Sequence, residues 1–120
     1  MAKIMIVDDS RILRKILTGT LTDAGHEVIA DAGNGKEALM LLEKVKPDLI
    51  TLDITMPEMD GVMALKKLKE KHPDAVVVMC SAMGQQQMVI EAIQAGAKDF
   101  IVKPFQPDRV LGSIKKVLGN

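Results

Sequence analysis

The stretch Leu49-Ile50-Thr51-Leu52-Asp53 is a short apolar run that ends in an aspartate. Three more apolar runs are followed by polar residues: Ile4-Met5-Ile6-Val7 by Asp8-Asp9, Val76-Val77-Val78-Met79-Cys80 by Ser81, and Phe100-Ile101-Val102 by Lys103. Runs of this length and composition predict strands that are buried on both faces, as in a parallel sheet. Because parallel strands end at the same edge of a sheet, we expect three carboxylates, a hydroxyl and an ammonium to meet there.

The segments between the apolar runs have the periodicity and punctuation of helices. Gly25 and Gly96 stand where helices should end, and Pro107 suits a first helical position. Thr18-Gly19-Thr20 makes the first helix the least convincing, since a glycine inside a helix costs about 1 kcal/mol relative to alanine. The alternation predicts an α/β fold with a doubly wound parallel sheet. We predict strands at residues 3–7, 27–30, 49–52, 76–80 and 100–102, and helices at 10–24, 36–45, 61–71, 85–95 and 107–118.

The composition is that of one globular domain. A length of 120 residues allows a single core, and 48% hydrophobic with 27% charged residues is an ordinary mixture. A formal net charge of zero and only two aromatic residues argue against a nucleic-acid partner. The residues before Asp8 are too few for a signal peptide, and no apolar run approaches a membrane span. We therefore expect a cytoplasmic protein without membrane association, with Cys80 as a buried, inert thiol.

The polar strand ends favour a cation site and a phosphoryl site. Taken singly, each residue has an ordinary explanation, such as a helix cap at Asp9 or Ser81 and a surface lysine at Lys103. Taken together at one edge, the residue types require more than capping. Clustered carboxylates repel one another, so a cation should lie among them. Oxygen ligands and a phosphate partner favour Mg²⁺, and Mn²⁺ is a second ion that such ligands accept.

The spacing of these residues resembles that of response-regulator receiver domains. The resemblance covers residues 1–120, which implies a single receiver domain with no residue left for an output domain. The resemblance is more specific in three segments, which are similar to single-domain chemotaxis regulators of Gram-positive and thermophilic bacteria: residues 53–61, 80–87 and 96–107. The resemblance implies a flavodoxin-like (βα)5 sheet with strand order 2-1-3-4-5, an order for which this family is itself a standard example.

The resemblance also implies a role for each carboxylate at the edge. Asp53 corresponds to the phosphoacceptor. Asp9 corresponds to the direct Mg²⁺ ligand, with Asp8 assisting largely through water and the Thr55 backbone carbonyl completing the protein ligands. In such a site a carboxylate attacks phosphorus from a phosphohistidine or an acyl phosphate, and positioning and electrostatics supply most of the catalysis.

Three further residues correspond to the family's switch. Ser81 matches the hydroxyl that moves to bond the phosphoryl oxygen, and Lys103 matches the lysine that pairs with the phosphate. Phe100 matches the aromatic side chain that changes rotamer, although many chemotaxis regulators have tyrosine there. The peptide between Lys103 and Pro104 is usually cis in the family, which implies a cis bond here.

The segment 85–95 carries more apolar surface than a helix on one face of a sheet can bury, so part of it should face outward. Single exposed apolar side chains are common, and this pattern alone is only suggestive. The resemblance to the family's output face implies a partner-binding surface that includes Val89, Ile93, Phe100 and Val102.

The implied function is that of a phosphorylation-activated response regulator acting as a monomer. Its partners would be a sensor histidine kinase, the flagellar motor switch protein and an aspartyl-phosphate phosphatase. It would not be an enzyme beyond its own phosphotransfer and a slow autodephosphorylation. A receiver of a sporulation or stress phosphorelay, outside chemotaxis, stays open.

Two other classes of protein fit the sequence less well. A Mg²⁺-dependent phosphatase of the haloacid-dehalogenase kind would have a second aspartate two residues after the nucleophile, where Thr55 stands. A flavodoxin-like cofactor module would have a phosphate-binding loop after the first strand, where Asp8-Asp9 would repel phosphate.

Overall fold

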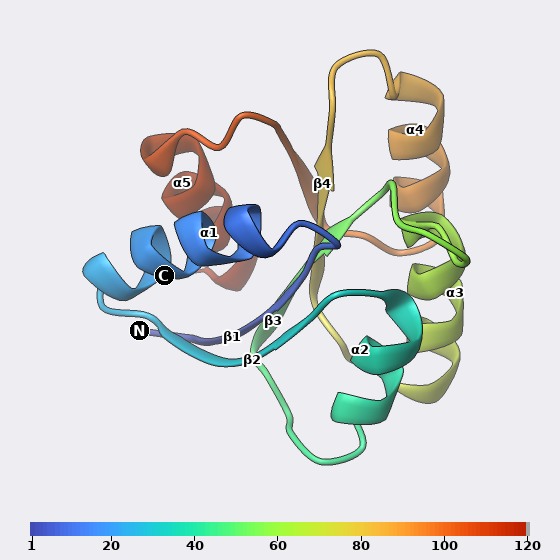
Figure 1. The fold of residues 1–120 in the computed structure, drawn as a ribbon, viewed down its shortest axis with the longest axis horizontal. Helices are drawn as coiled ribbons and strands as arrows, with labels where there is room; N and C mark the ends of the chain where they lie inside the picture. Colours follow the sequence, from blue (N-terminus) through green and yellow to red (C-terminus); the bar gives the residue numbers. More distant parts are fainter. Residues whose placement is uncertain (120) are drawn as a thin grey trace.

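Strands and helices alternate along residues 1–119, the part of the chain that the computed structural model describes (Figure 1). The strands are β1 (Lys3–Val7), β2 (Glu27–Ala32), β3 (Leu49–Asp53), β4 (Val77–Ser81) and β5 (Asp99–Val102). The helices are α1 (Arg11–Asp23), α2 (Gly35–Leu41), α3 (Gly61–Lys71), α4 (Gln86–Gln94) and α5 (Pro107–Leu118). Neighbouring strands are parallel in the order β2-β1-β3-β4-β5, which confirms the predicted fold class.

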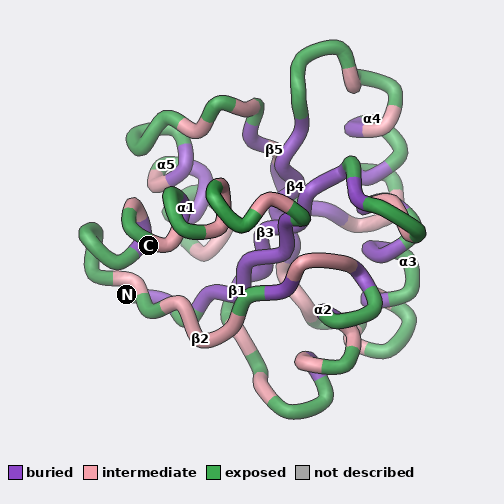
Figure 2. Tube along the Cα trace, viewed as in Figure 1, coloured by how far each residue is buried: buried purple, intermediate pink, exposed green. Residues whose placement is uncertain are grey.

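The helices form two layers on opposite faces of the sheet. Figure 1 shows α1 and α5 on one face and α2, α3 and α4 on the other. Successive strand residues point to opposite faces, so Ile4 and Ile6 join one core and Met5 and Val7 join the other. The central strands β1, β3 and β4 are buried almost throughout (Figure 2), as their continuous apolar sequences require.

Two polar residues belong to the strands themselves, one residue beyond the predicted ends. Asp53 is paired with Cys80 in the β3–β4 ladder, and Ser81 is paired with Val102 in the β4–β5 ladder. Both side chains are therefore held by regular backbone pairing. The second helix ends at Leu41, earlier than predicted, although a helix-like hydrogen bond from the Val45 N–H to the Leu41 carbonyl (3.0 Å) continues the turn.

The first helix is continuous through its poor helix formers. The Thr18 hydroxyl donates to the Arg14 carbonyl (2.7 Å), and the Thr20 hydroxyl donates to the Ile16 carbonyl (3.2 Å). These threonine side chains are thus satisfied within the helix, and Gly19 is tolerated between them. Within residues 1–119, no helix combines the length and apolar character needed to cross a bilayer.

The start of α3 packs directly behind Asp53. The Gly61 N–H donates to the Ile54 carbonyl (2.6 Å), and the Asp60 carboxylate caps the helix by accepting from the Met63 N–H (2.9 Å). A Cβ at position 61 would collide with the Asp53 carbonyl oxygen and would lie 2.7 Å from the Ile54 Cα. Glycine is required here because no side chain fits between the helix and the end of β3.

Candidate functional site

Carboxylates from the ends of two adjacent central strands meet at one edge of the sheet. Asp8 and Asp9 follow β1, and Asp53 ends β3. One carboxylate oxygen of each lies within 4.8 Å of the others; Asp8 and Asp53 are buried, whereas Asp9 is exposed. The strand order reverses between β1 and β3, because β2 lies on one side of β1 and β3 lies on the other. Doubly wound folds bind their ligands at this point of reversal.

A single ammonium lies among these carboxylates. Lys103, directly after β5, places Nζ 3.1 Å from Asp8 Oδ2 and 3.1 Å from Asp53 Oδ1. Burial lowers the pKa of Lys103, but the charges and hydrogen bonds of Asp53 and Asp8 outweigh it, so the pKa is raised and the ammonium stays charged. The structure thus brings together the three carboxylates and the lysine that the sequence placed at this edge.

Asp53 is held in an unfavourable electrostatic environment. Burial and the neighbouring Asp8 carboxylate raise the pKa of Asp53 to about 6, against an opposing effect of Lys103. When all are ionised, the three carboxylates and the Lys103 ammonium carry two net negative charges. The carboxylate oxygens lie close enough to one another to coordinate one ion. An all-oxygen site with this charge fits a divalent cation such as Mg²⁺.

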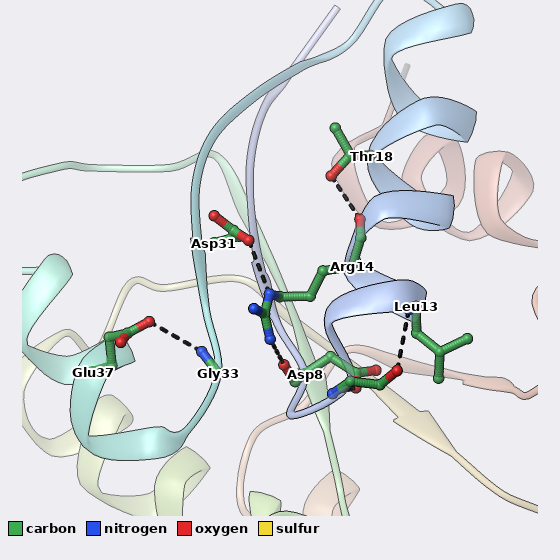
Figure 3. A network of polar contacts seen from close by, with 8 residues as sticks. Asp8, Leu13, Arg14, Thr18, Asp31, Gly33 and Glu37 are labelled. Carbon is green, nitrogen blue, oxygen red and sulfur yellow. Dashed lines mark hydrogen bonds and ion pairs between the residues drawn. The ribbon is translucent and has the colours of Figure 1, made fainter.

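The backbone of Asp8 is fixed by the first turns of α1 (Figure 3). The Arg14 guanidinium donates from Nη1 to the Asp8 carbonyl oxygen and from Nε to Asp31 Oδ2 (2.9 Å). The Ser10 N–H donates to Asp8 Oδ1 (2.8 Å), while the Ser10 hydroxyl caps α1 by accepting from the Leu13 N–H (3.2 Å). Sequence reasoning missed Arg14, because nothing in its position separates it from an ordinary surface arginine.

The remaining predicted residues lie around Asp53. Ser81 is buried, and its carbonyl accepts from the Lys103 N–H (2.7 Å). The Lys103–Pro104 peptide is cis. The Thr55 side chain is exposed, and its hydroxyl accepts a hydrogen bond from the Gln85 amide (2.6 Å). Gln85 is a second residue that sequence reasoning did not single out, although it lies in the segment 80–87 that carried the resemblance.

The partner-binding surface that the resemblance implies includes Val89, but this side chain is buried. Val89 is only 9% exposed and packs in the core with Ala92, three residues on, whereas Ile90 (50%) and Ile93 (43%) face outward. Helical periodicity explains the difference, because residues three apart lie on the same face of a helix. Val89 and Ala92 share the buried face, and Ile90 and Ile93 share the exposed one. Val102 is exposed and Phe100 is half-buried against the core.

A groove of about 520 Å³ lies between the loop after β4, the helix α4 and the strand β5. We call it the α4–β5 groove. Apolar side chains dominate its walls, and Ser81, the last residue of β4, is one of its lining residues. Its lining residues are Ser81, Ala82, Met83, Gly84, Gln85, Gln86, Val89, Ile90, Phe100 and Val102.

Comparison with known proteins identifies the family. Residues 4–115 match the family model described as the response regulator receiver domain. The chain belongs to this family and is a receiver domain of a two-component response regulator. It is similar to the chemotaxis protein CheY of Bacillus subtilis (57% identical, 97% of each chain covered) and of Thermotoga maritima (54% identical, 96% of each chain covered).

Solved structures agree with this assignment. The CheX-CheY-BeF3-Mg+2 complex from Borrelia burgdorferi contains a chain that is 40% identical with a TM-score of 0.91, covering 96% of this chain and 87% of that one. The receiver domain of NtrX from Brucella abortus is 36% identical with a TM-score of 0.91, covering 98% of each chain. The fold is therefore that of a CheY-like receiver domain, and the acidic cluster of Asp8, Asp9 and Asp53 is compatible with Mg²⁺ binding.

Proposed function

We propose that Asp53 accepts a phosphoryl group from the phosphohistidine of a sensor histidine kinase, and that the modified protein signals to the flagellar motor switch in chemotaxis. The observation that carries this proposal is the position of Asp53, buried beside Asp8 and 3.1 Å from the Lys103 ammonium. The similarity to CheY of several bacteria supports the chemotaxis output.

The environment of Asp53 suits a nucleophile. With a pKa of about 6, its carboxylate is mostly ionised at neutral pH, yet Lys103 is its one close cationic partner among residues 1–119. Its Oδ attacks phosphorus, forming a P–O bond while the P–N bond of phosphohistidine breaks and the electron pair returns to the imidazole. Lys103 then exchanges a carboxylate partner for phosphoryl oxygens, which carry more negative charge.

The metal ligands in this proposal are the carboxylates of Asp8, Asp9 and Asp53 and the backbone carbonyl of Thr55. A bound Mg²⁺, or Mn²⁺ in its place, supplies neutralising charge to the phosphoryl group. The Borrelia CheY complex, which is named with BeF3 and Mg+2, supports this assignment. Asp9 is the exposed member of the cluster and is therefore the ligand that a cation meets first.

The proposed output surface is the rim of the α4–β5 groove. Ile90 and Val102 line the groove together with Ser81, and both expose apolar surface. Ile93 exposes further apolar surface on the same helix, α4. Ser81 and Phe100 act as the switch residues between Asp53 and this surface. In this proposal the receiver domain acts as a monomer in the cytoplasm. An aspartyl-phosphate phosphatase would end the signal by removing the phosphoryl group from Asp53.

The test combines phosphorylation with partner binding. The protein is incubated with acetyl phosphate and Mg²⁺, and an amphipathic peptide from a flagellar motor switch protein is titrated against the free and phosphorylated forms. We expect phosphorylation to tighten binding by roughly 5- to 150-fold, the usual range of allosteric coupling. Ile90→Asp and Ile93→Asp should abolish that gain, whereas Ile12→Asp, on the exposed face of α1, should keep it.

Two outcomes would redirect the proposal. Equal peptide binding by both forms would favour a non-chemotaxis phosphorelay, provided that Asp53 is still phosphorylated. Steady turnover of a simple phosphate ester would favour a Mg²⁺-dependent phosphatase instead.

A further inference from the structure

The side chain of Gln85 connects two loops at the mouth of the site. Its Oε1 accepts a hydrogen bond from the Ala82 N–H (2.7 Å), and its Nε2 donates to Thr55 Oγ1 (2.6 Å). Ala82 follows β4, and Thr55 follows β3, so the loops that leave both strands beside Asp53 are joined through one amide. Both bonds have the short distances of well-formed hydrogen bonds.

The loop after β4 has little else to hold it. The α4–β5 groove opens on one side of it, the Met83 side chain is exposed, and Gly84 has a positive φ of 87°. Gln85 also occupies the N-cap position of α4, yet its side chain does not cap that helix. Within the described residues, Gln85 supplies both side-chain hydrogen bonds that reach this loop.

We propose that Gln85 is a positioning residue that latches the loop after β4 in the arrangement of the unphosphorylated protein. This inference rests on the proposed function of Asp53 and Ser81. Ala82 is covalently joined to Ser81, so a movement of Ser81 toward Asp53 carries the Ala82 N–H with it. A shift of about 1 Å lengthens a 2.7 Å bond beyond hydrogen-bonding distance, so Gln85 must release Ala82, Thr55 or both.

The latch acts on the switch because its two bonds distinguish the two loop positions. Interactions bias an equilibrium only when they differ between its states. A neutral hydrogen bond typically changes an equilibrium by about 2- to 12-fold after competition with water. Loss of the Gln85 side chain should therefore favour the displaced loop by a factor in this range.

The neighbouring glutamines provide a matched control. Gln87 is exposed and has no side-chain hydrogen bond among the described residues, so Gln87→Ala removes an amide of the same size without touching the latch. On the other loop, Thr55→Val removes the hydroxyl that Gln85 binds, while Thr55→Ser retains it. Gln85→Ala combined with Thr55→Val should have no more effect on the loop than Gln85→Ala alone.

The first measurement is amide hydrogen exchange at Ala82 in the unphosphorylated protein, which does not depend on the role of Asp53. We expect exchange to be at least 2-fold faster in Gln85→Ala, intermediate in Thr55→Val, and unchanged in Gln87→Ala and Thr55→Ser. Unchanged protection of Ala82 in Gln85→Ala would overturn the latch.

The second measurement is the affinity for beryllofluoride, used as a phosphoryl probe with Mg²⁺ present. We expect Gln85→Ala to bind about 2- to 12-fold more tightly than the wild type, with Gln87→Ala equal to the wild type. Equal or weaker binding by Gln85→Ala would overturn the coupling between the latch and the switch. If the wild type itself binds no beryllofluoride, the proposed function of Asp53 fails, and amide exchange still decides whether Gln85 holds the loop.

Discussion

Two aspartates are buried in the sheet, and their environments are opposite. Asp53 ends β3 at the site and is 3% exposed, whereas Asp99 begins β5 at the other edge and is 6% exposed. The pKa of Asp53 is raised to about 6, while the pKa of Asp99 lies below its ordinary value. Burial raises the pKa of both carboxyls, so the difference comes from their neighbours.

Asp99 is well supplied with donors. The Ser113 hydroxyl donates to Asp99 Oδ2 (2.7 Å), and the cations of Arg109 and Lys116 each lie 3.5 Å from the same oxygen. These groups and the Phe100 backbone N–H outweigh the effect of burial on the pKa. Asp53 instead faces Asp8, a group of like charge. Asp53 also pairs with Lys103, but this one ammonium does not outweigh burial and the Asp8 charge. A carboxylate with a perturbed pKa of this kind is typical of functional sites.

The largest expected effect separates the two aspartates by reactivity. Asp53→Asn should abolish labelling by acetyl phosphate, because the nucleophilic oxygen is lost, whereas Asp99→Asn should be labelled like the wild type. The acyl phosphate is trapped with borohydride and located by mass spectrometry. Undiminished labelling of Asp53→Asn, or labelling mapped to another residue, would remove Asp53 from the proposed chemistry.

Loss of a metal ligand should have the second largest effect. Asp9→Ala should weaken Mg²⁺ binding by more than the roughly 10- to 100-fold that is typical of outer-shell partners, because it removes the charge of the proposed direct ligand. Titration calorimetry measures the binding, and Asp74→Ala, an exposed carboxylate outside the acidic cluster, is the control. Phosphorylation of Asp9→Ala at the wild-type rate without added metal would contradict this assignment.

The pH dependence of stability should have opposite signs at the two aspartates. Asp53 binds its proton more tightly in the folded state, so its contribution is present below about pH 3.8 and is lost as the pH rises through about 6. Asp99 contributes above about pH 3.8 and loses its contribution as the pH falls through its lowered pKa.

The difference in unfolding free energy between Asp53→Asn and the wild type reports the first effect, because titrating groups that do not interact with Asp53 cancel. Without metal, Asp53→Asn should gain up to about 2–3 kcal/mol relative to the wild type between pH 4 and pH 7. Saturating Mg²⁺ should reduce that gain, because the cation compensates the Asp53 charge. A difference that does not vary with pH would contradict the electrostatic account.

Asp99→Asn should lower stability by a smaller amount, about 1–2 kcal/mol at pH 7. Asparagine still accepts from the Ser113 hydroxyl, but it loses the charge that pairs with Arg109 and Lys116. Urea unfolding measures the change, with Asp108→Asn, an exposed position in the first turn of α5, as the control. An Asp99→Asn protein as stable as the wild type would show that its donors are not stabilising.

The strands and the residues at their ends could be predicted from local sequence, whereas the environments of these residues depend on contacts between distant parts of the chain. Polar residues that end apolar runs placed Asp8, Asp53 and Lys103 at one edge, because strand direction alone aligns them. The raised pKa of Asp53 required the actual distances. Which face of α4 is buried was not predictable, because apolar residues nearly encircle the helix. Val89 and Ile90 are both apolar, so residue type does not show which of them is buried.

Arg14 and Gln85 were missed for a related reason. Their partners Asp31 and Thr55 are 17 and 30 residues away, so no local pattern indicates the contact. Side chains that bridge loops are chosen by tertiary geometry, whereas the strand ends are set by nearby sequence. The same limit applies to Asp99, whose partners on α5 become neighbours only in the folded sheet.

The smallest expected effect concerns a third polar residue of the sheet, Thr51. Its side chain is buried in β3, and its hydroxyl has no hydrogen-bond partner among residues 1–119. Unlike Asp53 it has no part in the proposed chemistry, and unlike Asp99 it has no donors or acceptors to compensate its burial. Thr51→Val keeps the shape and removes the unsatisfied group, so stability should rise by about 0.5–1 kcal/mol.

In Thr18→Val, by contrast, a hydroxyl that donates to the Arg14 carbonyl (2.7 Å) is lost, so no gain is expected. Urea unfolding of both variants tests this contrast, with labelling of Asp53 unchanged. A less stable Thr51→Val would show that this hydroxyl is satisfied in solution.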